Sequence, residues 1–169
     1  MGRIKYGIDL GTTNSAITKI EKGESVICKG DTGLDTTPSC VGYRKKGSVM
    51  SGVRAYNTLK ADKLKALKAG KSSESNFFIE FKRTMGSDKK YHSSICNEDF
   101  TSEQLSSEVL KRLKSYLQNE VIKSAVITIP AMFNDNQKSA TQKAAELAGI
   151  SQVELLQEPI AAAMAYGLD

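Results

Sequence analysis

The clearest hydrophobic pattern lies in the second half of the chain, where apolar residues recur every four positions among polar ones, at Leu105, Val109, Leu113 and Leu117. That spacing puts the four side chains on one face of a helix. Immediately upstream, Thr101 and Gln104 have the spacing of a capping box, in which each side chain satisfies a backbone N–H of the first turn. The sequence therefore predicts a helix over residues 102–118.

The rest of this half alternates between strands and helices. Its short apolar runs are rich in β-branched residues, as in buried strands, and its helices are bounded by capping residues and glycine. In chain order we predict a strand over 125–129 closed by Pro130, a helix capped by Asn134 or Asp135 with an inward stripe of Ala140, Ala144, Leu147 and Ala148 and a stop at Gly149, a strand over 153–156, and a helix over 160–166 after Pro159.

The first half is broken by glycines, and its apolar residues alternate over short runs, as in antiparallel strands joined by tight turns. The predicted elements are strands over 5–10, 15–20 and 25–28, a hairpin formed by 40–43 and 48–50, and a helix over 53–69. The segment 77–85 fits a short helix or a strand equally well, because its periodicity favours neither.

This order of elements predicts the fold class. A three-stranded antiparallel meander, followed by two strands that are each reached through a helix, describes an α/β fold with a ribonuclease-H-like core, in which the later strands pair in parallel beside the first. Residues 1–43 and 101–169 would form this core subdomain, and residues 44–100 would form an inserted, smaller α+β subdomain.

Composition and charge narrow the possible partners. The chain has 169 residues, 40% of them hydrophobic, and a net charge of +5, which suits one folded domain. Residues 44–90 hold thirteen basic and four acidic side chains, a local net charge of +9. Within them, four lysines alternate with apolar residues and predict a helix with a solvated lysine face, with an acidic-partner surface as the less favoured alternative. Since residues 59–68 contain no aromatic stacking platform, we expect no nucleic acid partner.

Several other classes are excluded. The longest apolar stretches are too short to span a membrane, and the N-terminus reaches Asp9 before any secretory apolar region develops, which predicts a cytoplasmic protein. Three widely spaced cysteines argue against a disulfide framework or a zinc site. His92 is the only histidine and no nucleophile elbow accompanies it, which argues against a Ser-His-Asp triad. A P-loop is excluded because Lys65 stands where the motif ending at Ser72 needs a glycine.

Candidate chemistry begins at the end of the first predicted strand. Asp9 offers a carboxylate to a hydrated divalent cation, and the turn 11–14 offers amides and hydroxyls to phosphate oxygens. Glycine at position 11 would let the backbone approach those oxygens. A tight turn with locally bonded threonines explains the same residues equally well. Lys82, which follows three phenylalanines, is a second phosphate candidate, although a surface cation beside a hydrophobic anchor is favoured for that segment alone.

The predicted topology also brings carboxylates together. Asp9, Asp135 and Glu158 follow neighbouring strands of the core, so they are expected to approach one cleft. Helix capping by Asp135 and a favourable helix-dipole position for Glu158 are the alternatives for the last two.

Four motifs taken together resemble the start of the DnaK-type, 70-kilodalton heat-shock chaperone family. They are Gly-Ile-Asp-Leu-Gly-Thr-Thr-Asn-Ser from residue 7, Phe-Lys-Arg-Thr-Met-Gly from residue 81, Ala-Val-Ile-Thr-Ile-Pro-Ala-Met-Phe-Asn-Asp from residue 125, and Glu-Pro-Ile-Ala-Ala-Ala-Met-Ala-Tyr-Gly-Leu-Asp from residue 158. They occur in the family's order and span nearly the whole chain. The resemblance implies the first lobe of an actin-like ATPase domain.

The resemblance also implies cofactors and residue roles, with ATP or ADP and Mg²⁺ as the cofactors. Asp9 and Glu158 would hold the magnesium ion through water, and Lys82 would contact the γ-phosphate and position the attacking water. Pro130 would change conformation with the nucleotide. The first phosphate loop would consist of Gly11, Thr12, Thr13 and Asn14.

Partners are implied in the same way: unfolded peptides, a J-domain cochaperone and a nucleotide-exchange factor, with no nucleic acid and no membrane. Three departures from the family pattern bear on them. Lys138 stands where an arginine usually links nucleotide state to the interdomain linker, Glu154 stands where a basic residue commonly helps to dock the J-domain, and Gln157 replaces an asparagine. These changes argue against conventional cochaperone coupling and leave the phosphate chemistry intact.

The leading hypothesis is therefore a lobe of an ATP-hydrolysing chaperone, which would be inactive as an ATPase in isolation because half of its cleft is missing. The alternative is a self-contained, non-catalytic regulatory or interaction module. A two-metal nuclease that uses Asp9, Asp135 and Glu158 is a third hypothesis, which explains neither Lys82 nor the threonines.

Overall fold

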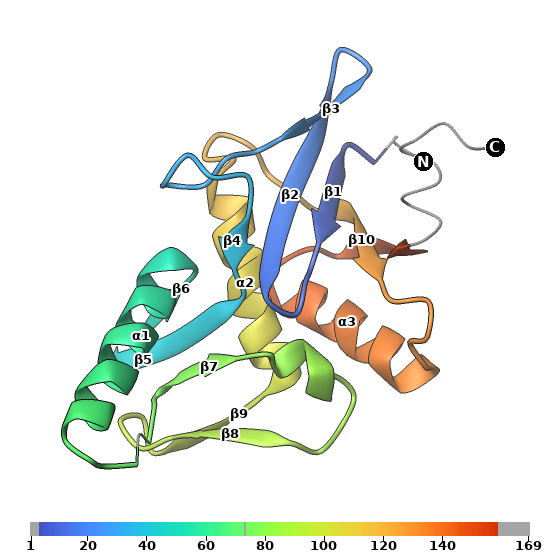
Figure 1. Cartoon of the computed structure of the whole chain (residues 1–169). Helices are drawn as coiled ribbons and strands as arrows, with labels where there is room; N and C mark the ends of the chain where they lie inside the picture. The colour runs from blue at the N-terminus through green and yellow to red at the C-terminus, as the bar shows by residue number, and fades with distance from the viewer. Residues whose placement is uncertain (1–3, 73, 159–169) are drawn as a thin grey trace.

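A sheet that mixes antiparallel and parallel strands organises the molecule (Figure 1). The computed structural model describes residues 4–72 and 74–158. Its elements are β1 (Tyr6–Asp9), β2 (Asn14–Glu21), β3 (Glu24–Ile27), β4 (Thr37–Pro38), β5 (Cys40–Lys45), β6 (Ser48–Ser51), α1 (Val53–Lys68), β7 (Phe77–Ile79), the short 3₁₀ helix η1 (Phe81–Thr84), β8 (Lys90–Ser93), β9 (Glu98–Thr101), α2 (Ser102–Ser115), β10 (Ser124–Ile129), α3 (Asp135–Leu147) and β11 (Gln152–Gln157). None of the helices within these residues has the length and apolar character needed to cross a bilayer.

The main sheet has the strand order β11-β10-β1-β2-β3, and the short β4 also pairs with β2. β1, β2 and β3 form the predicted antiparallel meander. β10 pairs in parallel with β1, and β11 pairs in parallel with β10. The predicted pairing of the later strands beside the first is therefore confirmed.

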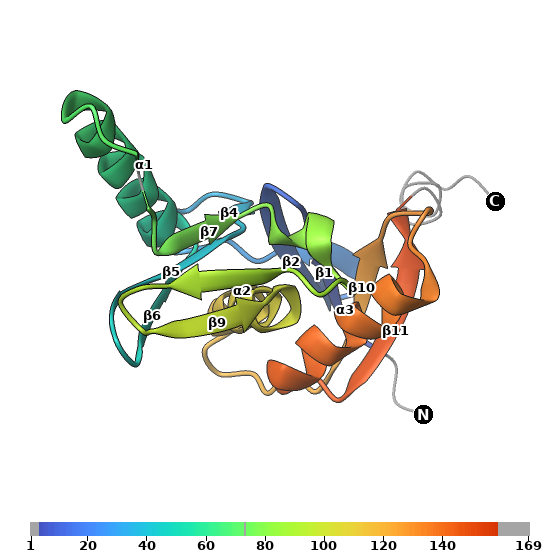
Figure 2. The same ribbon diagram turned by 90° about the horizontal axis from the view of Figure 1, so that it is seen from below.

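The hydrophobic core lies between this sheet and two helices. α2 and α3 pack side by side against one face of the sheet (Figure 2). The four-residue repeat of α2 is buried as predicted, against Ile8, Ile17 and Ile127 from the strands. The capping box of Thr101 and Gln104 is present, and the helix ends at Ser115, three residues earlier than predicted.

A second group of elements covers residues 40–101. Strands β6, β5 and β7 form a three-stranded sheet, and β8 pairs with β9. The ambiguous segment 77–85 contains both elements: β7 ends where Glu80 adopts a left-handed conformation with φ of 58°, and η1 follows at once. Sequence analysis missed the β8–β9 hairpin, because its polar residues carry no apolar alternation.

Two predictions about helix faces need correction. In α1, Leu64 and Leu67 are 52% and 77% exposed, so they do not lie on a buried side opposite the lysines. In α3, Ala140, Ala144 and Ala148 are buried, whereas Leu147 is exposed at the end of the helix. The predicted helix over 160–166 and its Pro159 lie outside the described residues.

An ionic cluster connects β1 and β2 to the loop before β10. The carboxylate of Glu120 accepts hydrogen bonds from the Tyr6 hydroxyl and from Lys19 Nζ, the latter at 2.6 Å. Hydrogen bonding to Lys19 and Tyr6 lowers the pKa of the Glu120 carboxyl below its usual value. The bond to Glu120 correspondingly raises the pKa of Lys19 and of Tyr6.

We expect the contribution of this cluster to stability to be sensitive to acid. A carboxyl group whose folded pKa is lowered stabilises the fold above its unfolded pKa of about 4.3, and that stabilisation is lost as pH falls through the folded pKa. In urea unfolding, Glu120→Gln should be less stable than the unmodified chain at about pH 7, and the two should converge below about pH 3. Glu24→Gln, on the exposed strand β3, is the control. A Glu120→Gln difference that does not change with pH would contradict the prediction.

Candidate functional site

The candidate site lies where three parallel strands end. In the register of the sheet, Asp9 of β1 stands beside Thr128 of β10, which stands beside Leu156 of β11. Glu158 follows two residues later, and the turn after β1 begins at the same edge. In open α/β sheets, ligands bind beyond the carboxyl ends of the strands, which is the location of these residues.

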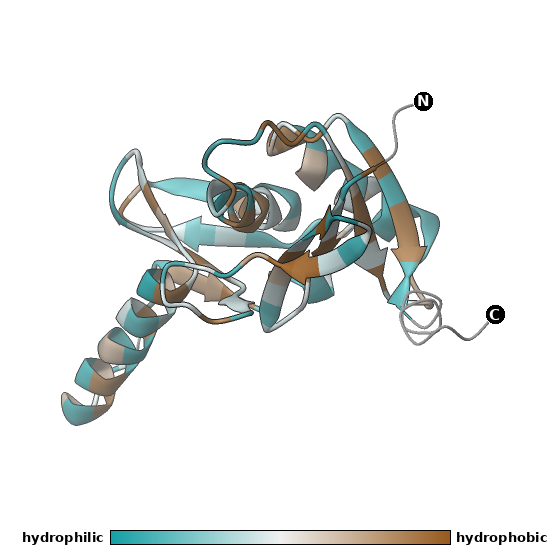
Figure 3. Ribbon diagram, turned by 90° about the horizontal axis from the view of Figure 1, so that it is seen from above, coloured by the Kyte–Doolittle hydropathy of each residue, from teal (hydrophilic) through white to brown (hydrophobic). Residues whose placement is uncertain are grey.

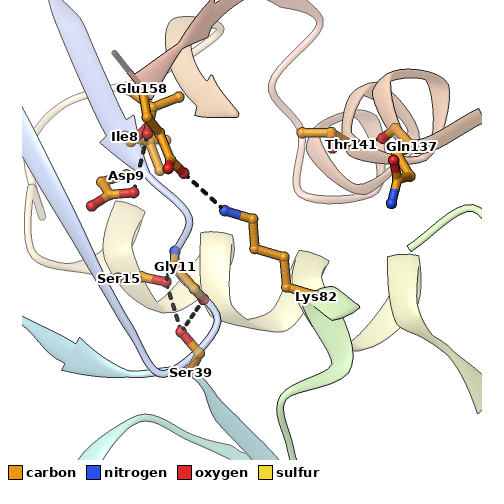
Figure 4. A network of polar contacts seen from close by, with 10 residues as sticks. Ile8, Asp9, Gly11, Ser15, Ser39, Lys82, Gln137, Thr141 and Glu158 are labelled. Carbon is orange, nitrogen blue, oxygen red and sulfur yellow. Dashed lines mark hydrogen bonds and ion pairs between the residues drawn. The ribbon is translucent and has the colours of Figure 1, made fainter. Parts of the chain in front are cut away.

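The Asp9 carboxylate is exposed and is hydrogen-bonded to a threonine of the neighbouring strand β10. The Thr128 hydroxyl donates a hydrogen bond to Asp9 Oδ1 at 3.0 Å, and Figure 4 shows this side chain at the end of β1, close to Glu158. One carboxylate oxygen is thereby oriented while the side chain remains open to solvent. This arrangement suits a carboxylate that meets a hydrated cation.

The turn after Asp9 is closed by two serines. The Gly11 N–H donates to Ser15 Oγ at 3.1 Å, Ser15 Oγ meets Ser39 Oγ at 2.8 Å, and Ser39 Oγ donates to the Gly11 carbonyl at 2.8 Å (Figure 4). Because the Ser39 proton goes to the carbonyl, Ser15 is the donor between the two hydroxyls. The Ser39 backbone N–H also donates to the Thr13 carbonyl at 2.8 Å.

Glycine at position 11 is required by the turn itself. A Cβ atom there would lie 1.9 Å from the carbonyl oxygen of Asn14, far inside van der Waals contact. The chain's own backbone therefore fills the space where a Cβ atom would lie, and closure of the turn alone accounts for a glycine at this position. Thr13 and Asn14 are exposed at the outer side of the turn, and Thr12 is half-buried.

Lys82 reaches the same edge from the other group of elements. It lies on η1, whose Phe81 is buried in the core and fixes the helix in place. The Lys82 side chain is only 8% exposed, and its Nζ lies 3.3 Å from Glu158 Oε1. The ammonium also lies 5.7 Å from the centre of the Phe133 ring. The structure therefore brings Asp9, the turn, Lys82 and Glu158 to one edge of the sheet (Figure 4).

The electrostatics of this lysine indicate what the site can accept. A buried cation is stable only when it is paired and hydrogen-bonded. Its carboxylate partner here, Glu158, is 46% exposed and occupies one of the three ammonium donors. Within residues 4–72 and 74–158, no other hydrogen-bond partner occupies the remaining donors, which leaves them for an anion at the edge of the sheet. An exposed carboxylate and a buried ammonium at one edge form a combination that can bind an anion together with its hydrated cation.

The structure does not bring Asp135 into this group. Asn134 is the N-cap of α3 and Asp135 is its first helical residue, so capping by Asp135 is wrong. The Asp135 side chain is fully exposed and pairs with Lys138 at 3.9 Å. Among the described residues, no three His, Cys, Asp or Glu side chains cluster as a metal site. A two-metal nuclease centre at Asp9, Asp135 and Glu158 is therefore not supported.

The other predicted residues lie nearby in the chain. Pro130 follows β10, is half-buried, and its carbonyl accepts a hydrogen bond from the Phe133 N–H at 3.1 Å. Lys138 lies on the first turn of α3 and Glu154 is exposed on β11. Sequence reasoning missed Ser15, Ser39, Thr128 and Phe133 as supporting residues. Ser15, Thr128 and Phe133 lie within the motifs as hydroxyl and aromatic side chains, whereas Ser39 carries no signal in the sequence.

Comparison with known proteins identifies the family. The Hsp70 protein family matches residues 5–169. A relative from Thalassiosira pseudonana, the chaperone protein dnaK, is 39% identical over 178 residues, covering 96% of this chain. The chain belongs to the Hsp70 family, whose members are heat-shock chaperones with a nucleotide-binding domain. It spans 29% of the length of that relative.

Proposed function

We propose that this chain is the first lobe of the nucleotide-binding domain of an ATP-driven chaperone. In this proposal, residues 1–43 and 101–169 form a ribonuclease-H-like core of the actin-like ATPase type, and residues 44–100 form the inserted α+β subdomain. Support comes from the family membership and from the strand order of the main sheet. The separate β6-β5-β7 sheet and its own small core of Cys40, Ala55, Leu59 and Phe77 support a second subdomain, although β5 already begins at Cys40, before the proposed boundary.

The residues at the edge of the sheet fit a nucleotide with Mg²⁺. The turn formed by Gly11, Thr12, Thr13 and Asn14 would bind phosphate oxygens through amides and hydroxyls, and its closure by Ser15 and Ser39 supports a fixed geometry. Asp9 and Glu158 would bind the magnesium ion through water. Among the described residues, these two carboxylates do not belong to a cluster of three or more side chains that would bind a metal ion directly. Lys82 would hold the terminal phosphate.

When bound, MgATP would supply the phosphoric anhydride bond that water cleaves. Phosphoryl transfer depends mainly on positioning and on compensation of charge in the transition state. Lys82 is suited to this role because its ammonium is buried, fixed by packing of η1, and only partly neutralised by Glu158. A rigid donor of this kind needs no reorganisation during the reaction.

In the whole protein, this ATPase would drive binding and release of unfolded peptides, assisted by a J-domain cochaperone and a nucleotide-exchange factor. Pro130 and Lys138 would transmit the nucleotide state, since both lie between the end of β10 and the first turn of α3. Glu154 and Lys138 differ from the family pattern, so the coupling would differ in detail.

The cysteines Cys28, Cys40 and Cys96 are free thiols, which is consistent with the reducing cytoplasm.

The observation that carries the proposal is the approach of Lys82 Nζ to Glu158, across 76 positions of sequence, beside Asp9 and the Gly11 turn. Residues from four motifs that are far apart in the sequence lie close together at this edge, which supports a phosphate site built from all of them. A module without nucleotide chemistry would not require a nearly buried lysine at this place.

Titration calorimetry tests this proposal. The 169-residue chain should bind MgATP only weakly, because a single lobe supplies one side of the cleft, and its hydrolysis should be negligible. The whole protein should bind MgATP at least about tenfold more tightly than the chain alone, a gain of about 1.4 kcal/mol. Equal affinity of the two would contradict the assignment of a half-site. A natural reading frame that stops after Asp169 would favour the self-contained module instead.

A further inference from the structure

Helix α1 is attached to the molecule by only part of its length. Its buried residues are Ala55 and Leu59, both in the first two turns, where they pack with Cys40 and Phe77. Its third turn is still bound to β5 through the ion pair of Asp62 with Arg44, and Figure 2 shows the end of the helix projecting from the molecule. Its last two turns consequently have a large surface that faces solvent.

The outward face of the helix carries apolar residues next to lysines. Tyr56, Lys60, Leu64 and Leu67 follow one another at helical spacings of three or four residues, Lys63 stands next to Leu64, and we call these five residues the outer stripe. In the stripe, Tyr56, Leu64 and Leu67 are 37%, 52% and 77% exposed. Figure 3 shows hydrophobic and hydrophilic residues mixed on this projecting helix. Apolar side chains that are gathered on one outward face indicate a surface that meets a partner.

The positive charge of this helix is uncompensated. The ion pairs formed within residues 4–72 and 74–158 include none from Lys60, Lys63, Lys65 or Lys68. Lys60 Nζ instead lies 4.8 Å from the centre of the Tyr56 ring. Asp62 is the acidic residue of α1 and already binds Arg44 at 3.1 Å. Among the described residues, these exposed lysines therefore remain available to carboxylates of a partner.

We propose that the outer stripe is a docking site for an acidic amphipathic polypeptide segment, whose apolar side chains cover Leu64 and Leu67 and whose carboxylates pair with Lys60 and Lys63. Charge complementarity between the lysines of the stripe and the carboxylates of the segment selects this occupant. An anionic membrane fits less well because membrane binding grows with buried apolar area, and only two leucines are available. This site is separate from the phosphate site and does not depend on the nucleotide.

The test uses fluorescence anisotropy with the 169-residue chain and a labelled probe peptide of about 18 residues, in which Glu and Leu repeat at spacings of three and four. We expect saturable binding that weakens as NaCl rises from about 50 to about 300 mM, because exposed ion pairs are screened. Leu64→Gln combined with Leu67→Gln should weaken binding at least about tenfold, and Lys60→Glu combined with Lys63→Glu should do the same. Glutamine and glutamate preserve helix propensity.

A matched control replaces an exposed apolar residue and a lysine elsewhere. Val121 is 79% exposed, Lys123 lies two residues away, and Val121→Gln with Lys123→Glu should leave peptide binding unchanged. Circular dichroism of each variant checks that the fold persists. The proposal is overturned if the probe does not bind, if the control variant loses as much affinity as the stripe variants, or if the chain binds phosphatidylserine vesicles or a single-stranded oligonucleotide through the stripe and not the peptide.

Discussion

Replacing Lys82 by alanine in the whole protein should lower the rate of ATP hydrolysis by about 10²–10³-fold, the range found when one preorganised donor is removed from a developing negative charge. The fold should persist, because Phe81 and Met85 keep η1 anchored and Glu158, being partly exposed, remains hydrated without its partner. Single-turnover measurement with bound ATP isolates the chemical step from nucleotide release.

Arg83→Ala is the matched control for this substitution. Arg83 is the next residue on η1, is exposed, and pairs with Glu80 at 3.6 Å, so its loss should change the hydrolysis rate little. Lys82→Met retains most of the side-chain volume and should behave like Lys82→Ala. Retained single-turnover hydrolysis in both Lys82 variants would show that the catalytic cation is elsewhere.

Gly11→Ala should have the second large effect. The new Cβ atom would lie 1.9 Å from the Asn14 carbonyl oxygen, so the turn must open and its hydrogen bonds to Ser15 and Ser39 must break. We expect a loss of at least about 2 kcal/mol in the free energy of unfolding, from strain and two lost bonds. In the whole protein, MgATP affinity should fall at least about tenfold as well.

Gly47→Ala separates the general cost of a glycine replacement from closure of this turn. Gly47 has a φ of 75° with open space around its Cβ position, so alanine there should cost about 1–2 kcal/mol of backbone strain. Gly47→Ala should leave the affinity of the whole protein for MgATP unchanged. If Gly11→Ala binds MgATP as tightly as Gly47→Ala does, the turn is not the phosphate loop.

Much of the fold followed from periodicity. The apolar repeat of α2 and its capping box predicted a buried helical face because both signals arise from neighbouring residues. The β8–β9 hairpin was not predicted, because its pairing is stabilised by tertiary contacts. One of these contacts is the stacking of Tyr43 on Phe100, with ring centres 4.5 Å apart. A local sequence window does not contain that information.

The candidate site was likewise predicted where local motifs name its residues and missed where tertiary contacts place them. The motifs named Asp9, Lys82 and Glu158, and the sheet topology then brought these residues together. Ser39 was missed because its contact with Gly11 depends on the pairing of β4 with β2, far along the chain. The choice of Asn134 over Asp135 was available from sequence, since Gln137 completes a capping box only with Asn134.

We infer that one edge of the main sheet binds the phosphates of a nucleotide. A crystal structure of the whole protein with ADP, phosphate and Mg²⁺ tests it most directly. We predict that phosphate oxygens lie within hydrogen-bond distance of the Gly11–Asn14 turn and of Lys82 Nζ, with the magnesium ion connected to Asp9 and Glu158 through water. Phosphates bound away from this turn, with Lys82 still paired only to Glu158, would contradict the account.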